Sequence, residues 1–320
     1  LGVWGEPIAN TDVLCFGPLD LDPSKLPRGV KHPRYLFKGV VAGIGAYGNN
    51  MGIPTVNGAI YFDEGYTGNV VVYCGCIGLL PKSRYAREVK PGHLIVLAGG
   101  RTGRDGIHGV TFASAELTEE SGEVSRPAVQ IPNPIEEEVL KRAILEIRDR
   151  GLASGITDLG GGGLSSAVGE TAHRYGCGAE VELDRVPLKD PYMAPWEIWI
   201  SESQERMLLA IPEENREEVL GIFEGEGVEA TVIGRFTPDP YLKITYKGVT
   251  VADISIDFLF QPPRVRRKAS WRKPLLKEPS IPLPKDLGEV LLKLLSSPNI
   301  ASREGVVRTY DHEVKGNTVL

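Results

Sequence analysis

The sequence lacks the long apolar runs of membrane proteins, and neither sign of charge is in large excess. A membrane-spanning helix needs about 20 consecutive apolar residues, and no run in these 320 residues approaches that length. Lys and Arg number 36 against 42 Asp and Glu, so the net charge is −6. No global basic field therefore favours nucleic acid. Residues 1–10 lack the basic and apolar regions of a signal peptide.

Cysteine is also scarce, with four residues in the chain. Cys74 and Cys76 have a C-x-C spacing, which differs from the C-x-x-C spacing of zinc knuckles and redox pairs. Both fall in an apolar run over Asn69–Leu80, so we expect small core residues of a strand. Cysteine usage of this kind indicates a reducing, cytoplasmic compartment.

Familiar catalytic motifs are missing as well. The chain has no Ser-His-Asp order, no H-E-x-x-H and no catalytic cysteine context. Gly43–Gly48 does fit G-x-G-x-x-G, but the dinucleotide-binding motif follows a strand and opens a helix. These glycines lie inside a helix that we predict over Pro33–Asn50, so close helix packing explains them better than a dinucleotide site.

What remains is a globular composition of about two domains, with 42% hydrophobic and 24% charged residues. Before a boundary near Pro91-Gly92 we predict the helix Pro33–Asn50 and the strands Thr55–Phe62 and Asn69–Leu80. After it we predict a strand over His93–Ala98, helices from Asn133 to Gly151, Leu164 to Tyr175 and Pro212 to Phe223, and a hairpin of Tyr241–Tyr246 with Val249–Ile256. Interleaved strands and helices predict an α/β or α+β fold with a mixed sheet.

The composition changes over Gln261–Leu287, which contains six prolines and a basic cluster from Arg264 to Lys273. This composition predicts a linker strapped over a surface. A contact with phosphate or with an acidic partner is the alternative. We predict a short helix over Asp286–Leu295 and the start of a further unit over Ser302–Leu320.

The first candidate ligand segment is the arginine loop, Gly99–Gly109. Five of its eleven residues are glycine, directly after a predicted strand. Backbone N–H groups can approach a ligand closely in such a loop. Arg104, Asp105 and His108 would supply contacts to anions and hydroxyls. The alternative is a tight structural loop held by an Arg–Asp pair.

The second segment is the aspartate loop, Asp158–Leu164, in which four glycines lead into a predicted helix. Free N–H groups and the positive end of the helix dipole would then lie beside Asp158, with Gly161 and Gly162 as candidate ligand contacts. A carboxylate next to an anion site suits magnesium that bridges to phosphates. The alternative is an aspartate that caps the helix.

The third segment is the polar segment, Ser201–Arg206, which follows the apolar Ile198–Ile200 at the expected end of a strand or in a turn. Its serine, glutamate and glutamine side chains offer donors and acceptors for a sugar, an amide or a phosphate. A solvated turn is the alternative. Together the three segments indicate a magnesium-bound nucleotide or a phosphorylated small molecule as the ligand.

In this order, the three segments resemble those of the large subunit of phosphoribosylformylglycinamidine synthase, in its smaller bacterial and archaeal form. Further matching motifs are Tyr47–Thr55, Leu183–Leu188 and Tyr310–Val314. The resemblance covers nearly the whole chain. Single motifs are shared with other ATP-using enzymes of the superfamily: aminoimidazole ribonucleotide synthetase, selenophosphate synthetase and thiamine-monophosphate kinase. One of these activities is the alternative function.

The resemblance implies an ATP-dependent carbon–nitrogen ligase of purine biosynthesis. Formylglycinamide ribonucleotide and glutamine-derived ammonia would give formylglycinamidine ribonucleotide through an iminophosphate. The implied fold is a partial ferredoxin-like N-domain of the aminoimidazole ribonucleotide synthetase type, followed by an α/β sandwich with a mixed sheet. The implied divisions are 1–90, 91–262, a strap with a short helix over 263–299, and the start of a second N-type domain over 300–320.

By position, Asp158 matches a magnesium ligand of the family. Gln130, Glu202, Ser203 and Gln204 match substrate contacts, although Ile131-Pro132-Asn133-Pro134 departs from the usual Gly-Asp-Pro after that glutamine. The resemblance assigns no role to Arg104, Asp105 or His108.

The family's catalytic histidine motif, its ATP-contacting lysine and an acidic metal ligand would lie upstream of Leu1. We therefore expect an internal piece of a longer protein that is inactive alone, and we assign no catalytic residue within it. The implied partners are a glutaminase subunit and a small bridging subunit.

Overall fold

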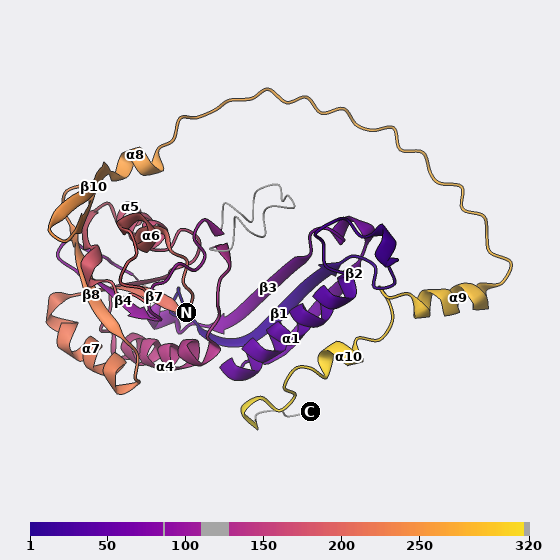
Figure 1. The fold of residues 1–320 in the computed structure, drawn as a ribbon, viewed down its shortest axis with the longest axis horizontal. Helices are drawn as coiled ribbons and strands as arrows, with labels where there is room; N and C mark the ends of the chain where they lie inside the picture. The colour runs from indigo at the N-terminus through magenta and orange to yellow at the C-terminus, as the bar shows by residue number, and fades with distance from the viewer. Residues whose placement is uncertain (86, 110–127, 317–320) are drawn as a thin grey trace.

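The computed structural model describes residues 1–85, 87–109 and 128–316, and they form two sheets with separate cores (Figure 1). In the first, β1 (Glu6–Phe16) lies between parallel β2 (Thr55–Phe62) and antiparallel β3 (Val71–Leu79). The helix α1 (Pro33–Met51) packs on one face around Leu14 and Phe16 of β1.

The sequence predicted α1 well because its ends are set locally. The imidazole of His32 accepts a hydrogen bond from the Arg34 backbone N–H at 3.1 Å, and Pro33 occupies the first turn. Gly52 ends the helix with φ 65°, a left-handed conformation that favours glycine.

Cys74 and Cys76 are exposed, so the prediction that they are core residues was wrong. Both lie on β3, which is an edge strand of the three-stranded sheet. None of the β3 residues belongs to the apolar clusters of the described chain. The strand was predicted correctly, but its place at the edge depends on strand order, which local pattern does not encode.

The second unit is a seven-stranded mixed sheet of order β10-β9-β6-β8-β4-β7-β5, in which only β6 and β9 pair in parallel. Its strands are β4 (Leu94–Gly99), β5 (Gly155–Asp158), β6 (Gly178–Glu182), β7 (Arg206–Ile211), β8 (Ala230–Thr237), β9 (Tyr241–Tyr246) and β10 (Val249–Ser255). The strands β1, β5, β6, β7 and β8 were not predicted from the sequence. Their length does not explain this, because β4 and β9 were predicted and have six residues each.

Helices cover both faces of this sheet, which confirms the expected α/β sandwich. The helices α4 (Pro134–Arg150) and α7 (Arg216–Gly225) share one apolar core with alternate residues of β4. The helices α5 (Leu164–Tyr175), α6 (Pro195–Ile200) and α8 (Ile256–Phe260) share the core on the other face. β4 is buried on both faces, as its continuous apolar run predicted. None of the helices in the described ranges combines the length and apolar character of a transmembrane span.

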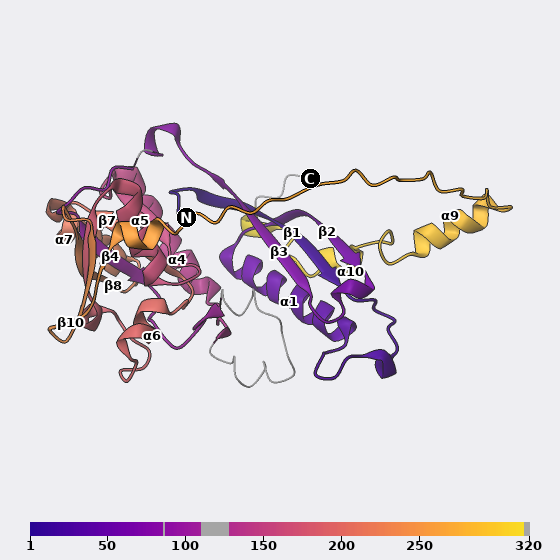
Figure 2. The ribbon, with the colours of Figure 1, turned by 90° about the horizontal axis from the view of Figure 1, so that it is seen from above.

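The proline-rich segment does not lie over a surface, contrary to expectation. Residues 261–285 are exposed throughout and run as an extended trace to α9 (Leu287–Ser296), as two views show (Figure 1 and Figure 2). The prolines remove donors for regular pairing, and no apolar surface of the described chain covers the segment. After α9 the chain returns to the first unit, where Val306 of α10 (Glu304–Val307) joins the core beside Leu14.

Candidate functional site

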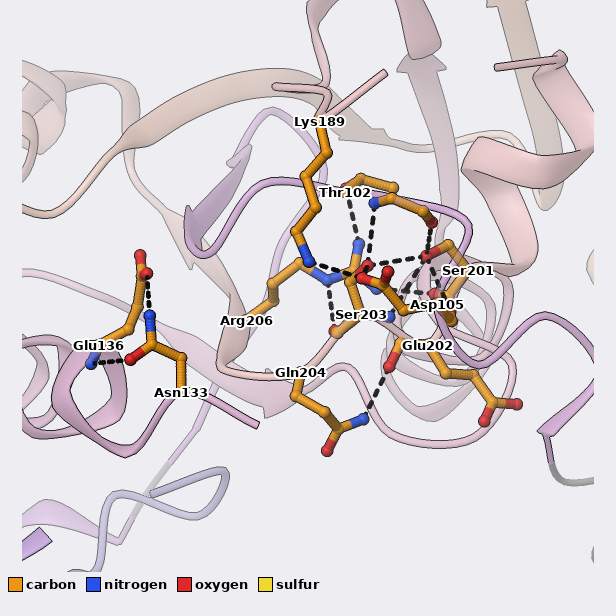
Figure 3. Close-up of polar contacts among 11 residues, drawn as sticks. Thr102, Asp105, Asn133, Glu136, Lys189, Ser201, Glu202, Ser203, Gln204 and Arg206 are labelled. Atoms are coloured by element: carbon orange, nitrogen blue, oxygen red, sulfur yellow. Dashed lines mark hydrogen bonds and ion pairs between the residues drawn. The ribbon is translucent and has the colours of Figure 1, made fainter. Parts of the chain in front are cut away.

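The arginine loop and the polar segment pack against each other around two buried side chains, Asp105 and Ser203 (Figure 3). The Ser203 hydroxyl donates a hydrogen bond to the Asp105 carboxylate and accepts one from the Gly103 backbone N–H at 2.9 Å. The Ser201 hydroxyl donates to the Gly103 carbonyl at 2.7 Å. Two loops separated by 100 residues of sequence are thereby held in one arrangement.

Arg206, the first residue of β7, holds these two loops together through its buried guanidinium. Its side chain is 2% exposed and donates to the Ser203 and Ser201 carbonyls at 2.7 Å each and to the Thr102 hydroxyl at 2.8 Å. Burial lowers the pKa of Arg206 to about 10, and the Asp105 charge opposes that fall. The guanidinium therefore stays charged at neutral pH and holds the backbone of the polar segment.

Glu202, in the polar segment, forms hydrogen bonds with the arginine loop, with the aspartate loop and with Gln130. The side chain is 2% exposed, and its carboxylate accepts the Gly162 backbone N–H at 3.1 Å and the Gln130 amide at 2.9 Å. Its own backbone N–H donates to the Asp105 carbonyl at 3.0 Å. The structure thus clusters residues that lie far apart in the sequence and that the resemblance had grouped by role.

Ser203 and Gln204 differ in what they can offer a ligand. The Ser203 side chain is fully buried, and its backbone N–H donates to the Ser201 hydroxyl at 3.2 Å. Its hydrogen-bonding groups are therefore engaged within the loops. Gln204 is partly exposed, and its amide donates to the Glu202 carbonyl at 2.7 Å. In this arrangement Gln204 is accessible, whereas Ser203 supports its neighbours.

Asp158 ends β5 and is exposed at the start of the aspartate loop. It does not cap α5, because the N-cap residue of that helix is Gly163 and no side chain caps it. A Cβ at Gly163 would lie 1.9 Å from the Ser201 carbonyl oxygen, so only glycine permits this close approach. The Gly161 carbonyl accepts the Ser166 hydroxyl at 2.5 Å. The Asp158 carboxylate is therefore exposed without capping the helix, and it lies next to Gly2 and beside the end of the polar segment.

Arg104 is engaged in structural ion pairs rather than open to an anion. Its guanidinium pairs with Asp190, lies 2.8 Å from the Glu197 carboxylate and donates to the Tyr192 carbonyl at 3.0 Å. The expected Arg–Asp pair therefore exists, but with a residue outside the arginine loop. Hydrogen bonds from Arg104 and the Ala194 backbone lower the pKa of Glu197.

Asp105 and His108 have separate surroundings. Lys189 forms an ion pair with the Asp105 carboxylate at 2.6 Å, which balances a nearly buried charge. The His108 ring stacks on Trp196 of α6 with centroids 6.2 Å apart and has a positive φ of 59°. Asp105 therefore holds the loops together, and His108 lies at their outer edge.

The sequence did not reveal two partners of these loops, Lys189 for Asp105 and Tyr47 for Glu205. Lys189 has no motif around it, and its role depends on a tertiary contact. Tyr47 of α1 donates a hydrogen bond to the Glu205 carboxylate at 2.9 Å and so links the two units. Tyr47 begins a motif that was quoted for the resemblance, and Lys189 directly follows another, but neither residue was assigned a role.

A model described as "AIR synthase related protein, N-terminal domain" matches residues 2–80, and one described as "AIR synthase related protein, C-terminal domain" matches residues 90–247. Phosphoribosylformylglycinamidine synthase subunit PurL of Picrophilus torridus is 45% identical over 318 residues, which are 98% of this chain and 42% of that protein. The PurL subunit of Thermococcus kodakarensis is 43% identical over 319 residues and is covered to 43%. The chain thus spans about two fifths of these relatives.

Solved structures of Thermotoga maritima PurL are also similar. The PurL complexed with FGAR has a TM-score of 0.70 and 30% identity over 87% of this chain and 44% of that one. The PurL complexed with ATP has a TM-score of 0.69 and 26% identity over 97% and 45%. The PurLQS structure has a TM-score of 0.74 and 27% identity over 98% and 46%. By both its domains, this chain belongs to the AIR synthase related proteins and, within them, is most plainly similar to PurL.

Proposed function

We propose that the protein to which this chain belongs converts formylglycinamide ribonucleotide, ATP and glutamine-derived ammonia into formylglycinamidine ribonucleotide, ADP and phosphate. The observation that carries the proposal is the meeting of Gln130, Glu202 and the Gly162 backbone. The similarity to PurL proteins solved with FGAR and with ATP supports the same reaction.

The reaction has two bond exchanges. The amide oxygen of the substrate takes the terminal phosphoryl group of ATP, and ADP leaves. Ammonia then attacks the amide carbon of this iminophosphate, and phosphate leaves. Phosphoryl transfer depends mainly on positioning and on stabilising negative charge, so rigid loops rich in N–H groups suit it. Within this chain, we assign substrate positioning to Gln130, Glu202 and Gln204, with Ser203 holding the segment.

We propose Asp158 as a magnesium ligand. The carboxylate is exposed, is not used to cap α5, and lies at the start of the glycine-rich loop that leads into that helix. Within the described ranges, no group of three or more His, Cys, Asp or Glu side chains is arranged to hold a metal ion. Magnesium usually keeps several waters and takes one or two carboxylates with substrate phosphates, and a single available carboxylate fits that pattern. The ion would neutralise charge on the transferring phosphoryl group.

We further propose that the whole protein acts in the cytoplasm with a glutaminase subunit and a small bridging subunit. The PurLQS assembly of Thermotoga maritima supports such a complex. One candidate docking element is the basic segment from Arg264 to Lys273, which is exposed over its full length. Reversing those charges would weaken the complex in a pull-down; unchanged assembly would exclude this element.

The test of the reaction is ADP release by the complete protein with magnesium-ATP, ammonia and formylglycinamide ribonucleotide. We expect release to require both ammonia and the ribonucleotide. Release without the ribonucleotide would overturn the proposal and favour another ATP-using activity of the superfamily. We also expect the 320-residue chain alone to release no ADP.

A further inference from the structure

The residue that follows the proposed substrate contacts, Glu205, is held in an unfavourable backbone conformation. Its φ is 53°, in the left-handed region that glycine adopts freely and glutamate rarely does. The Gly100 backbone N–H donates to the Glu205 carbonyl at 2.9 Å. A Cβ at Gly99 would lie 2.1 Å from that carbonyl oxygen, so the end of β4 leaves room only for glycine there.

The Glu205 side chain faces the other unit of the protein. Its carboxylate accepts the Tyr47 hydroxyl of α1 at 2.9 Å. Burial raises the pKa of this carboxyl above its ordinary value, and the Asn133 backbone and the Tyr47 hydroxyl oppose that rise. The Glu205 side chain thus joins the polar segment to the first unit. Glycine at this position would relieve the backbone strain, so the glutamate side chain must compensate through these contacts.

We propose that Glu205 is a positioning residue, which orients Glu202 and Gln204 for the ribonucleotide by tying the polar segment to Tyr47. The inference rests on the proposed function, because it concerns the substrate site of that reaction. Tyr47 and Glu205 are separated by 158 residues of sequence, and theirs is a direct side-chain hydrogen bond between α1 and the polar segment. When this bond is absent, the polar segment can shift relative to the first unit, although Arg206 still binds the Ser201 and Ser203 carbonyls.

The experiment is a double-mutant cycle in the complete protein, with Tyr47→Phe, Glu205→Ala and the pair combined. We expect each single variant to raise KM for the ribonucleotide about tenfold, the scale of a lost hydrogen bond to a charged group. KM for ATP should stay within about twofold. The combined variant should be no worse than Glu205→Ala alone, because both changes remove the same bond.

Two further variants separate positioning from stability. Glu205→Gly removes the side chain and the backbone strain together, so its thermal midpoint should be at or above that of Glu205→Ala. Its KM for the ribonucleotide should be as high as in Glu205→Ala. Glu205→Gln keeps an acceptor for Tyr47 and should recover most of the affinity. Tyr35→Phe is the matched control, since Tyr35 lies on the same helix and is 68% exposed.

The inference is overturned if KM for the ribonucleotide is unchanged in Tyr47→Phe, or if the two single effects simply multiply in the combined variant. It is also overturned if all variants lose thermal stability with wild-type KM, since that would be a purely structural contact. These outcomes differ from failure of the proposed function, which would appear in the unaltered protein as ADP release that ignores the ribonucleotide.

Discussion

The backbone N–H of Gly162 donates a hydrogen bond to the Glu202 carboxylate at 3.1 Å. This contact joins the loop that carries Asp158 to the segment that carries the proposed substrate contacts. A ligand bound to either loop is therefore bound beside the other. The arrangement suits a reaction in which a phosphoryl group passes between two substrates held side by side.

Replacing Glu202 tests the centre of this arrangement. Glu202→Gln preserves shape, but its amide offers one acceptor where Gly162 and Gln130 both donate. We expect kcat/KM for the ribonucleotide to fall about 10- to 100-fold, equivalent to about 1.4–2.8 kcal/mol. The measurement is steady-state ADP release by the complete protein. Glu224→Gln, an exposed residue of α7, is the control; equal effects of the two changes would contradict the assignment.

Asp158→Asn tests the proposed magnesium ligand. The amide keeps one neutral oxygen but loses the charge that a hard cation prefers. We expect the magnesium concentration for half-maximal rate to rise at least about tenfold, the factor that about 1.4 kcal/mol supplies. Asp253→Asn is the matched control, because β10 and β5 form opposite edges of the seven-stranded sheet. An unchanged magnesium titration would remove Asp158 as a ligand.

Arg206→Met tests the anchor of the polar segment. The substitution leaves two carbonyls and a hydroxyl buried without their donor. We expect the free energy of unfolding to fall by at least about 3 kcal/mol, because each buried acceptor left without a donor costs about 1–3 kcal/mol. Urea unfolding followed by fluorescence measures this. Arg216→Met removes an exposed ion pair and should change stability by less than about 1 kcal/mol. Similar losses in both variants would show that Arg206 is not an anchor.

Asp12 of β1 predicts a pH dependence of stability. The residue is 5% exposed, and neither carboxylate oxygen has a hydrogen-bond partner among the described residues. Burial raises its pKa above the ordinary 3.8. The native state therefore binds the Asp12 proton more tightly than the unfolded state does. The stability that this protonated carboxyl contributes is fully present below about pH 4 and is lost as the pH rises through the native pKa.

Asp12→Asn should accordingly have a higher thermal midpoint than the wild type at pH 7. The difference between the two midpoints should shrink as the pH is lowered toward about 4. Asp22 provides a control of opposite sign, because hydrogen bonds from Ser24 lower its pKa. Asp22→Asn should slightly lower the thermal midpoint at pH 7, and this loss should disappear as the pH falls through the native pKa of Asp22. The Cys74 thiol opposes the rise in the pKa of Asp12, and a wild-type advantage over Asp12→Asn at pH 7 would show that this contact outweighs burial.

Local signals in the sequence predicted elements whose ends are set by neighbouring residues. The helix α4 begins after Asn133, whose side chain accepts the Glu136 backbone N–H at 3.4 Å, and ends at Gly151 with φ 69°. The helix α5 was predicted with its observed bounds. The helix α7 begins later than predicted, because a short 3-10 turn over Glu213–Asn215 precedes it.

Local patterns in the sequence predicted the longer helices α1, α4, α5, α7 and α9, the double-sided burial of β4 and the three polar or glycine-rich segments, because propensity, capping and apolar period are local properties. They did not predict α6, whose residues Ile198–Ile200 were expected at the end of a strand. That β3 is an edge strand, that Arg104 pairs with Asp190 and that Tyr47 reaches Glu205 follows from the tertiary structure alone. These outcomes depend on strand order and on contacts between residues far apart in the chain. No pattern within one segment can specify such contacts, since each partner's environment is created by the fold.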